Sequence, residues 1–238
     1  MGWIIAAGVL MAAAAGLWIT MQHGCLPFVR LNRKPREGQI RVACVGDSIT
    51  YGYGIRNWSC NNYPAQLGHW LGDGYCVQNF GVCGATASLQ GDLPHEKEAA
   101  YRESLAFRPE IVLLMLGTND SKPNNYIGQE AYAEDMKRIL AAYRALPSRP
   151  RVYLLTPPPA FSVNGNPVAF DIRADVIENE LRPAVKALAN TEEVPCIDLY
   201  AACENRSEWF WDGVHPNADG AKGITETITA YLKQEQQV

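Results

Sequence analysis

Between residues 40 and 233, five short apolar runs alternate with segments that are polar or amphipathic. Aliphatic runs of this length predict buried strands, and apolar residues at helical spacing predict helices between them. The predicted strands are 40–45, 75–80, 111–116, 152–155 and 196–199. The predicted helices begin at 63, cover 96–107, 129–146 and 172–189, and follow residue 217. This alternation predicts an α/β fold in which helices cover both faces of a parallel sheet.

Two of these helices carry clear apolar stripes. Leu67, Trp70 and Leu71 form the predicted buried stripe of the helix that begins at Tyr63. The helix over 129–146 has a longer stripe, made of Tyr132, Met136, Ile139, Leu140 and Tyr143. Asn217 is the predicted N-cap of the last helix.

The chain opens with an uncharged, mostly apolar run between residues 3 and 21. As a helix this run would reach roughly 28 Å, close to the hydrocarbon thickness of a bilayer. We therefore predict that residues 1–21 are an apolar helix outside the folded domain, as a signal peptide or a membrane anchor. Residues 22–38 would be a linker and 39–238 the folded domain. Export or anchoring on the periplasmic or extracellular side is favoured, although four basic residues between 30 and 36 leave a cytoplasmic-facing anchor open.

Composition narrows the function classes. The formal net charge is −4 and no basic stripe appears, so the sequence predicts no nucleic-acid partner. Of the 7 cysteines none forms a CxxC pair or a Cys/His ligand spacing, so no zinc site is predicted. No cofactor is predicted either. A hydrophobic content of 47% with 19% charged residues is sufficient for a full globular core.

Polar residues follow the strands where each one ends. The first strand ends at Gly46-Asp47-Ser48, and similar loops begin at Gly81 and at Gly117-Thr118-Asn119. A fourth loop, Asp212 to His215, precedes the last helix. Loops at the carboxyl ends of parallel strands meet at one edge of the sheet, where ligands bind. Ser48 is thus a candidate nucleophile, the alternative being an ordinary turn or N-cap serine.

The residue types in these loops suit acyl transfer. Ser48 would be the nucleophile, His215 the general base, and Asp212 the group that orients the imidazole. Asp212 lies three residues before His215, in a loop that precedes a helix. The N–H groups of Ser48 and Gly81 and the amide of Asn119 would form the oxyanion hole.

These blocks resemble the SGNH (GDSL-type) hydrolase superfamily. The first block matches Gly46-Asp47-Ser48, the second Asn79-Phe80-Gly81, the third Gly117-Thr118-Asn119-Asp120, and the fifth Asp212 to His215. The resemblance implies a flavodoxin-like three-layer α/β/α fold, here with a five-stranded parallel sheet. It also implies ester hydrolysis through an acyl-enzyme without a metal. The wider neighbourhood looks like that of bacterial carbohydrate O-acetylesterases.

The predicted substrate is a short-chain (acetyl) ester on a small molecule or glycan. Asp47, Trp58, Lys122 and Trp211 are the predicted substrate-binding residues, and Trp209 is a further candidate for stacking on a sugar. The alternative for these tryptophans is packing in the core or anchoring of a loop. The sequence leaves the oligomeric state open, and the membrane is a partner only if residues 1–21 are retained.

Two other functions compete with this prediction. A lysophospholipase or thioesterase would act at the membrane to which the chain is anchored. A non-catalytic carbohydrate-binding protein on the same fold is less compatible with a complete set of Ser48, Gly81, Asn119, Asp212 and His215. Activity on acetyl versus long-chain esters distinguishes the predicted acetylesterase from a lysophospholipase or thioesterase.

Overall fold

The computed structural model describes residues 32–236. The predicted apolar helix of residues 1–21, and most of the predicted linker, lie outside the described residues. Within 32–236, no helix has both the length and the apolar character needed to cross a membrane.

The described residues contain one five-stranded parallel sheet with the order β2-β1-β3-β4-β5. This is the flavodoxin-like order, so the predicted fold class is confirmed. The strands are β1 (Ile40–Gly46), β2 (Tyr75–Gly81), β3 (Ile111–Met115), β4 (Arg151–Leu155) and β5 (Cys196–Ile197).

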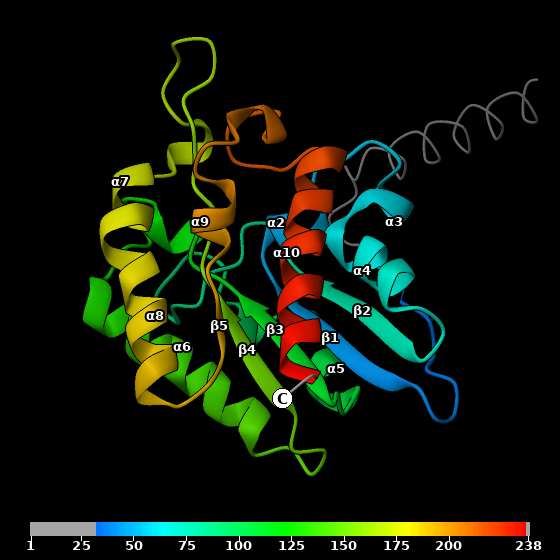
Figure 1. The fold of residues 1–238 in the computed structure, drawn as a ribbon. Helices are drawn as coiled ribbons and strands as arrows, with labels where there is room; N and C mark the ends of the chain where they lie inside the picture. The colour runs from blue at the N-terminus through cyan, green and yellow to red at the C-terminus, as the bar shows by residue number, and fades with distance from the viewer. Residues whose placement is uncertain (1–31, 237–238) are drawn as a thin grey trace, which may run out of the picture.

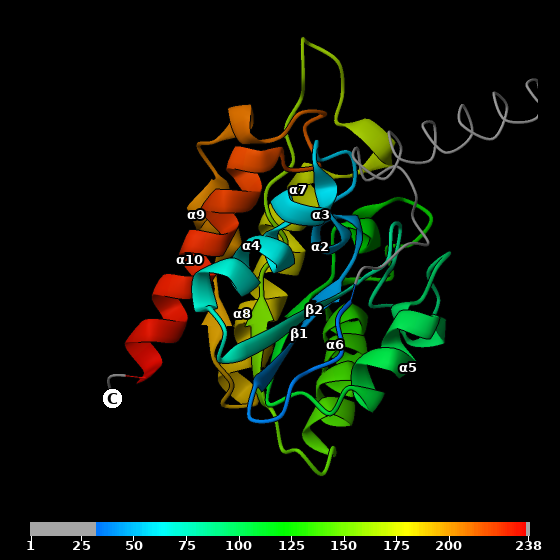
Figure 2. The same ribbon diagram turned by 90° about the vertical axis from the view of Figure 1, so that its right-hand side faces the viewer.

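Helices cover both faces of the sheet, as Figures 1 and 2 show. α5, α6 and α8 pack on one face, and α4, α9 and α10 pack on the other. The helices are α2 (Ser48–Tyr51), α3 (Trp58–Asn61), α4 (Tyr63–Leu71), α5 (Ala99–Ala106), α6 (Gln129–Arg144), α7 (Ala174–Val176), α8 (Arg182–Thr191), α9 (Leu199–Cys203) and α10 (Ala218–Gln236), with a π-helical turn at Ile177–Leu181 between α7 and α8.

Alternate residues of each strand divide between two cores. In β1, Ala43 and Val45 join the core under α5, α6 and α8, whereas Val42 and Cys44 join the core under α4, α9 and α10. All four side chains are fully buried. Burial on both faces explains why the strands are continuous apolar runs rather than alternating ones.

Most of the predicted elements are present, with three differences. The stripe of α6 is buried as predicted, but Trp70 in α4 is 49% exposed, so the prediction that it belongs to the buried stripe is wrong. The predicted helix over 96–107 is a short 3-10 turn, His95–Lys97, followed by α5.

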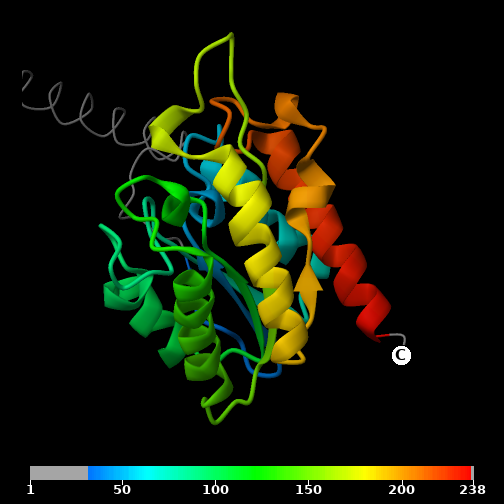
Figure 3. The same ribbon diagram turned by 90° about the vertical axis from the view of Figure 1, so that its left-hand side faces the viewer.

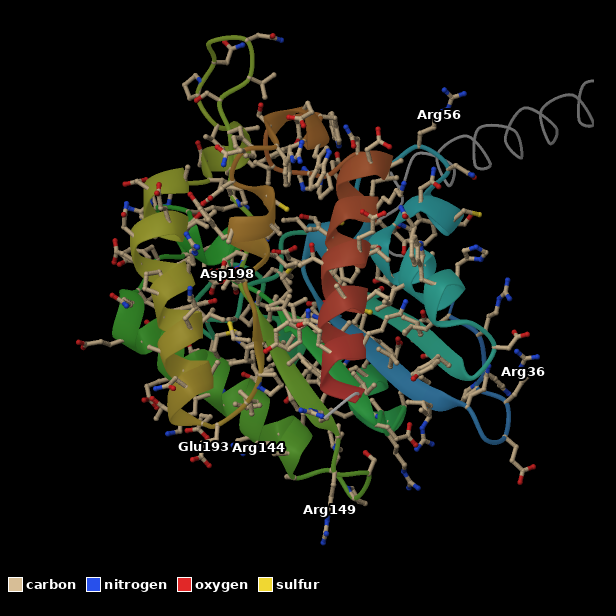
Figure 4. All side chains as sticks on the ribbon, in the orientation of Figure 1. Arg36, Arg56, Arg144, Arg149, Glu193 and Asp198 are labelled. Atoms are coloured by element: carbon tan, nitrogen blue, oxygen red, sulfur yellow. The ribbon has the colours of Figure 1, made fainter. Side chains whose placement is uncertain are left out.

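The third difference concerns β5, which ends two residues early. Asp198 stops the strand because its carboxylate caps α9 through the N–H of Ala201 and pairs with Arg182 and Lys186 of α8, each at 2.9 Å. Figure 4 shows Asp198 between the ends of α8 and β5. One carboxylate therefore ties the edge of the sheet to the neighbouring helix.

The carboxyl ends of the strands all lie at one end of the molecule. Here α2 follows β1 directly, and the long segment after β4 rises above the domain before α7 begins (Figure 3). The labelled Arg144 and Arg149 mark the opposite end (Figure 4). The carboxyl end is therefore where the polar loops predicted from the sequence come together.

Candidate active site

Ser48 is the first residue of α2, and it is not the helix cap. Asp47 is the cap, because its Oδ1 accepts the N–H of Ile49 at 2.8 Å. This leaves the hydroxyl of Ser48 free for another partner, so the alternative of an N-cap serine is wrong. Ser48 is 6% exposed.

The partner of this hydroxyl is His215. The Nε2 atom of His215 lies 2.8 Å from Oγ of Ser48, and its Nδ1 atom lies 2.7 Å from Oδ2 of Asp212. A carboxylate can only accept, so Nδ1–H donates to Asp212 and Nε2 accepts the hydroxyl proton of Ser48. The structure thus brings together the three residues that the sequence predicted.

The second oxygen of Asp212 shapes the turn that carries His215. Oδ1 accepts the N–H of Val214 at 3.0 Å and that of His215 at 2.7 Å. Burial alone would raise the pKa of Asp212, but the hydrogen bonds that it accepts from His215 and Val214, and the charge that His215 carries when protonated, outweigh burial and hold the pKa below its ordinary value. The carboxylate is therefore ionised at neutral pH and keeps Nδ1 protonated.

Gly81 does not have the predicted role in the oxyanion hole. Its N–H is already bonded to Oδ1 of Asn79 at 2.9 Å. Position 81 requires glycine for another reason, because a Cβ there would lie 2.2 Å from the backbone nitrogen of Tyr51 in α2. The prediction is corrected accordingly: Gly81 permits β2 to pack closely against the helix that begins with Ser48.

Gly84, in the turn that follows β2, differs from Gly81 in this respect. It has a left-handed φ of +85°, and within residues 32–236 no acceptor is bonded to its N–H. The Nδ2 atom of Asn119 donates to the carbonyl oxygen of the next residue, Ala85, at 3.1 Å. Asn119 and the turn at Gly84 therefore share one edge of the site, and a second glycine after β2 was the signal in the sequence.

The predicted substrate-binding residues separate into two kinds. Trp58 is 2% exposed, its indole N–H is bonded to the carbonyl of Tyr51, and its ring stacks on that tyrosine. Asp47 is 1% exposed and serves as the cap of α2; burial raises its pKa to about 6. Both predictions are wrong, because each side chain is committed to the fold. Trp211, in contrast, is 48% exposed and lies beside His215.

The remaining candidates for substrate binding are Lys122 and Trp209. Lys122 is half-buried in the loop after Asn119, and its positive charge offsets a small part of the rise that burial causes in the pKa of Asp47, which places it near the site. Trp209 packs on α10, where a Cβ at Gly223 would lie 2.4 Å from its ring. Trp209 is thus a packing residue.

Two aromatic residues near His215 were absent from the sequence prediction. The ring of Tyr53 lies 4.9 Å from the imidazole and that of Phe170 5.2 Å, centroid to centroid. Phe170 comes from the long loop after β4. Within residues 32–236, no group of three or more His, Cys, Asp or Glu side chains is arranged to hold a metal ion.

Among curated proteins, the chain is 39% identical over 217 residues to an acetylxylan esterase from Xylanibacter ruminicola, a match that covers 84% of this chain and 44% of that protein. It is 27% identical over 234 residues to a multidomain esterase from Ruminococcus flavefaciens, covering 82% of this chain and 29% of that protein. The chain thus spans less than half the length of these two relatives.

Solved structures share the fold. A carbohydrate acetylesterase family member from Sinorhizobium meliloti matches with a TM-score of 0.66 at 20% identity, covering 84% of this chain and all of the other. An aryl esterase from M. smegmatis also has a TM-score of 0.66, at 20% identity, covering 82% and 99%. The sequence model of the GDSL-like lipase/acylhydrolase family matches residues 44–222, which include every residue of the site from Ser48 to His215. The chain therefore belongs to the GDSL-like lipase/acylhydrolase family.

Proposed function

We propose that this protein is a serine esterase that hydrolyses short-chain acetyl esters, namely O-acetyl groups on carbohydrate. The observation that carries the proposal is the continuous hydrogen-bond chain from Oγ of Ser48 through His215 to Asp212, with both links shorter than 3 Å. Such a chain activates a hydroxyl, which is a weak nucleophile at its own pKa.

The reaction would proceed through an acetyl-enzyme. His215 takes the proton of Ser48 as Oγ bonds to the ester carbonyl carbon, and the resulting imidazolium is stabilised by Asp212. His215 then gives this proton to the leaving alcohol as the bond between carbonyl carbon and alcohol oxygen breaks. A water molecule, deprotonated by His215, then attacks the carbonyl carbon of the acetyl group on Ser48. The bond between that carbon and Oγ breaks, His215 returns the proton to Oγ, and acetate leaves.

The negative oxygen of each tetrahedral intermediate needs donors. We propose the N–H groups of Ser48 and Gly84 and the Nδ2 amide of Asn119. The N–H of Ser48 lacks an intrahelical acceptor because it opens a helix, and that of Gly84 is unbonded within the described residues. Removing one such donor typically costs a factor of 10² to 10³ in kcat.

Carbohydrate is the favoured carrier of the acetyl group. The acetylxylan esterase match, at 39% identity, covers 84% of this chain. The lysophospholipase or thioesterase alternative has no comparable support and is not favoured. The exported or anchored location, with the domain on the periplasmic or extracellular side, stays a prediction from residues 1–21, as do the domain boundaries.

The test is release of acetate from acetylated xylan by the wild type and by Ser48→Ala. We expect the variant to lose kcat by a factor of about 10⁴ to 10⁶, because the nucleophile is gone while the fold is retained. Ser59→Ala, which removes an exposed hydroxyl in α3, is the matched control and should keep full activity. Hydrolysis by Ser48→Ala at more than a tenth of the wild-type rate would contradict the proposal.

A further inference from the structure

Three aromatic side chains surround the imidazole of His215, and none of them is needed for the steps above. We call Tyr53, Phe170 and Trp211 the aromatic cluster. Their ring centroids lie 4.9, 5.2 and 6.3 Å from that of His215. Tyr53 and Trp211 also contact one another, with centroids 6.4 Å apart.

Two rings of the aromatic cluster are among the few large apolar side chains that the described residues leave exposed. Phe170 is 50% exposed and Trp211 is 48% exposed. Exposed aromatic faces cost solvation free energy, so their grouping beside a reactive residue suggests that a ligand covers them. Burial in the core, the ordinary fate of such rings, is excluded by these exposures.

The backbone fixes Trp211 in place. Trp211 lies against Gly54, where a Cβ would come within 2.5 Å of the indole ring. The backbone N–H of Trp211 donates to the backbone carbonyl of His215 at 3.1 Å. The indole and the imidazole are nearly parallel, at 25°.

The loop that carries Phe170 is anchored by hydrogen bonds on both sides of that residue. The N–H of Phe161 donates to the carbonyl of Gly213 at 2.8 Å, and Nε of Arg173 donates to the carbonyl of Ser121 at 2.6 Å. Phe170 itself has a left-handed φ of +62°. A bulky residue rarely adopts this conformation, and where it does so near a reactive group the strain commonly serves function.

The chemistry assigns the aromatic cluster to one part of the substrate. His215 gives its proton to the leaving oxygen, so this oxygen must lie within hydrogen-bond reach of Nε2. Groups around the imidazole therefore contact the alcohol part of the ester. The carbonyl oxygen of the acetyl group would instead contact the donors proposed above, the N–H of Gly84 and the amide of Asn119.

Resting on the proposed function, we propose that the aromatic cluster is the subsite for the leaving alcohol and that it takes a pyranose ring. A pyranose has an apolar C–H face, which stacks on an aromatic ring, and hydroxyl groups at its rim, which need water. A half-exposed ring provides an apolar surface for the C–H face and leaves the hydroxyl groups at the rim in contact with water. A flat aryl alcohol would gain from the same stacking, so the test must distinguish the two.

The experiment compares kcat/KM on acetylated xylobiose, phenyl acetate and ethyl acetate, which present a pyranose, an aryl and an alkyl alcohol. The variants are Trp211→Ala and Phe170→Gly, the latter because glycine tolerates the left-handed φ. The matched control is Trp70→Ala, which removes an equally exposed tryptophan from α4. All variants are checked for folding by circular dichroism.

We expect the ratio of kcat/KM for acetylated xylobiose to that for ethyl acetate to fall about tenfold in Trp211→Ala and severalfold in Phe170→Gly, in keeping with the worth of one aromatic contact. Trp70→Ala should leave the ratio unchanged. An unchanged ratio in both cluster variants would overturn the inference. So would a fall confined to phenyl acetate, which would assign the cluster to aryl alcohols. A wild type that hydrolyses none of the three esters would instead contradict the proposed function.

Discussion

The Nε2 atom of His215 lies 2.8 Å from Oγ of Ser48, although 167 positions separate the two residues in the chain. An aspartate fixes the local structure around each of them. Asp47 accepts the N–H of Ile49 and so caps the helix that begins with Ser48, and Asp212 accepts the N–H of His215 and so closes the turn that ends there. The long-range contact thus depends on two short-range structures that the sequence encodes locally.

The first prediction concerns the tautomer of His215. In Asp212→Asn, Oδ1 can still accept the N–H groups of Val214 and His215, so the turn should persist. The amide nitrogen would then face Nδ1 and stabilise the tautomer whose Nε2 carries the proton, and that nitrogen cannot accept from Ser48. We expect kcat to fall by a factor of about 10⁴ with little change in melting temperature. Steady-state kinetics and thermal unfolding measure both, and a loss below tenfold would contradict the role of Asp212.

The second prediction separates oxyanion binding from substrate binding. Asn119→Ala removes the Nδ2 donor, and since this donor acts mainly in the transition state, kcat should fall by about 10² to 10³ with a small change in KM. Asn124→Ala, which truncates an exposed amide in the same loop, is the control and should behave as wild type. A loss seen chiefly in KM would mean that Asn119 binds the ground state instead.

Much of the fold was predictable because the relevant patterns are local. Strands buried on both faces appear as apolar runs, and the stripe of α6 follows helical spacing, so both were found. Trp70 was misplaced because helical spacing alone does not show how far around α4 the buried face extends. β5 was overextended because Asp198 caps α9 and also pairs with Arg182 of α8, and the pairing with α8 cannot be read from the residues around the strand.

The site was predictable in its reactive groups and less so in their surroundings. Gly81 and Gly84 look equivalent in the sequence; what distinguishes them is that the side chain of Asn79 occupies the N–H of Gly81. Trp58 and Trp211 are likewise the same residue type, and only tertiary packing buries one and exposes the other. Phe170 left no signal beyond its place in a long loop, because its proximity to His215 is set by the anchoring of that loop.

The third prediction tests the corrected role of Gly81. In Gly81→Ala, the new methyl group would lie 2.2 Å from the nitrogen and 2.7 Å from the Cα of Tyr51, which are backbone atoms that cannot rotate away. We expect α2 to shift, the free energy of unfolding to fall by about 1–3 kcal/mol, and kcat to fall because Ser48 moves with the helix.

Gly68→Ala provides the control for this variant. A Cβ at position 68 would meet nothing nearer than Val77 at 3.4 Å, an ordinary contact. Because alanine favours helix over glycine, this variant should be as stable as the wild type or more so. Equal stability of the two variants in urea unfolding would show that the approach of β2 to α2 is not the reason for glycine at 81.

The last prediction concerns Asp120, a buried carboxylate that follows Asn119. It accepts the N–H groups of Ala87 and Ser88 at 3.0 and 2.9 Å. Burial raises the pKa of Asp120 to about 7, because it outweighs the effect of these hydrogen bonds, and the nearby charge of Asp47 acts in the same direction. In the unfolded chain the same carboxyl titrates near pH 4, as aspartates ordinarily do. Between about pH 4 and pH 7 the folded state therefore binds more protons at this position than the unfolded state does.

It follows that Asp120 lowers the free energy of unfolding as pH rises from about 4 to 7. The side chain in Asp120→Asn is neutral at every pH. At pH 4, where the substitution removes only a hydrogen-bond acceptor, we expect the variant to be less stable than the wild type. By pH 7 the difference in stability should vanish or change sign. Melting temperatures of the wild type, Asp120→Asn and the exposed control Asp175→Asn, measured at half-unit steps of pH, test this. If the difference between Asp120→Asn and the wild type is the same at every pH, Asp120 titrates alike in the folded and unfolded chains, and burial has not shifted its proton affinity.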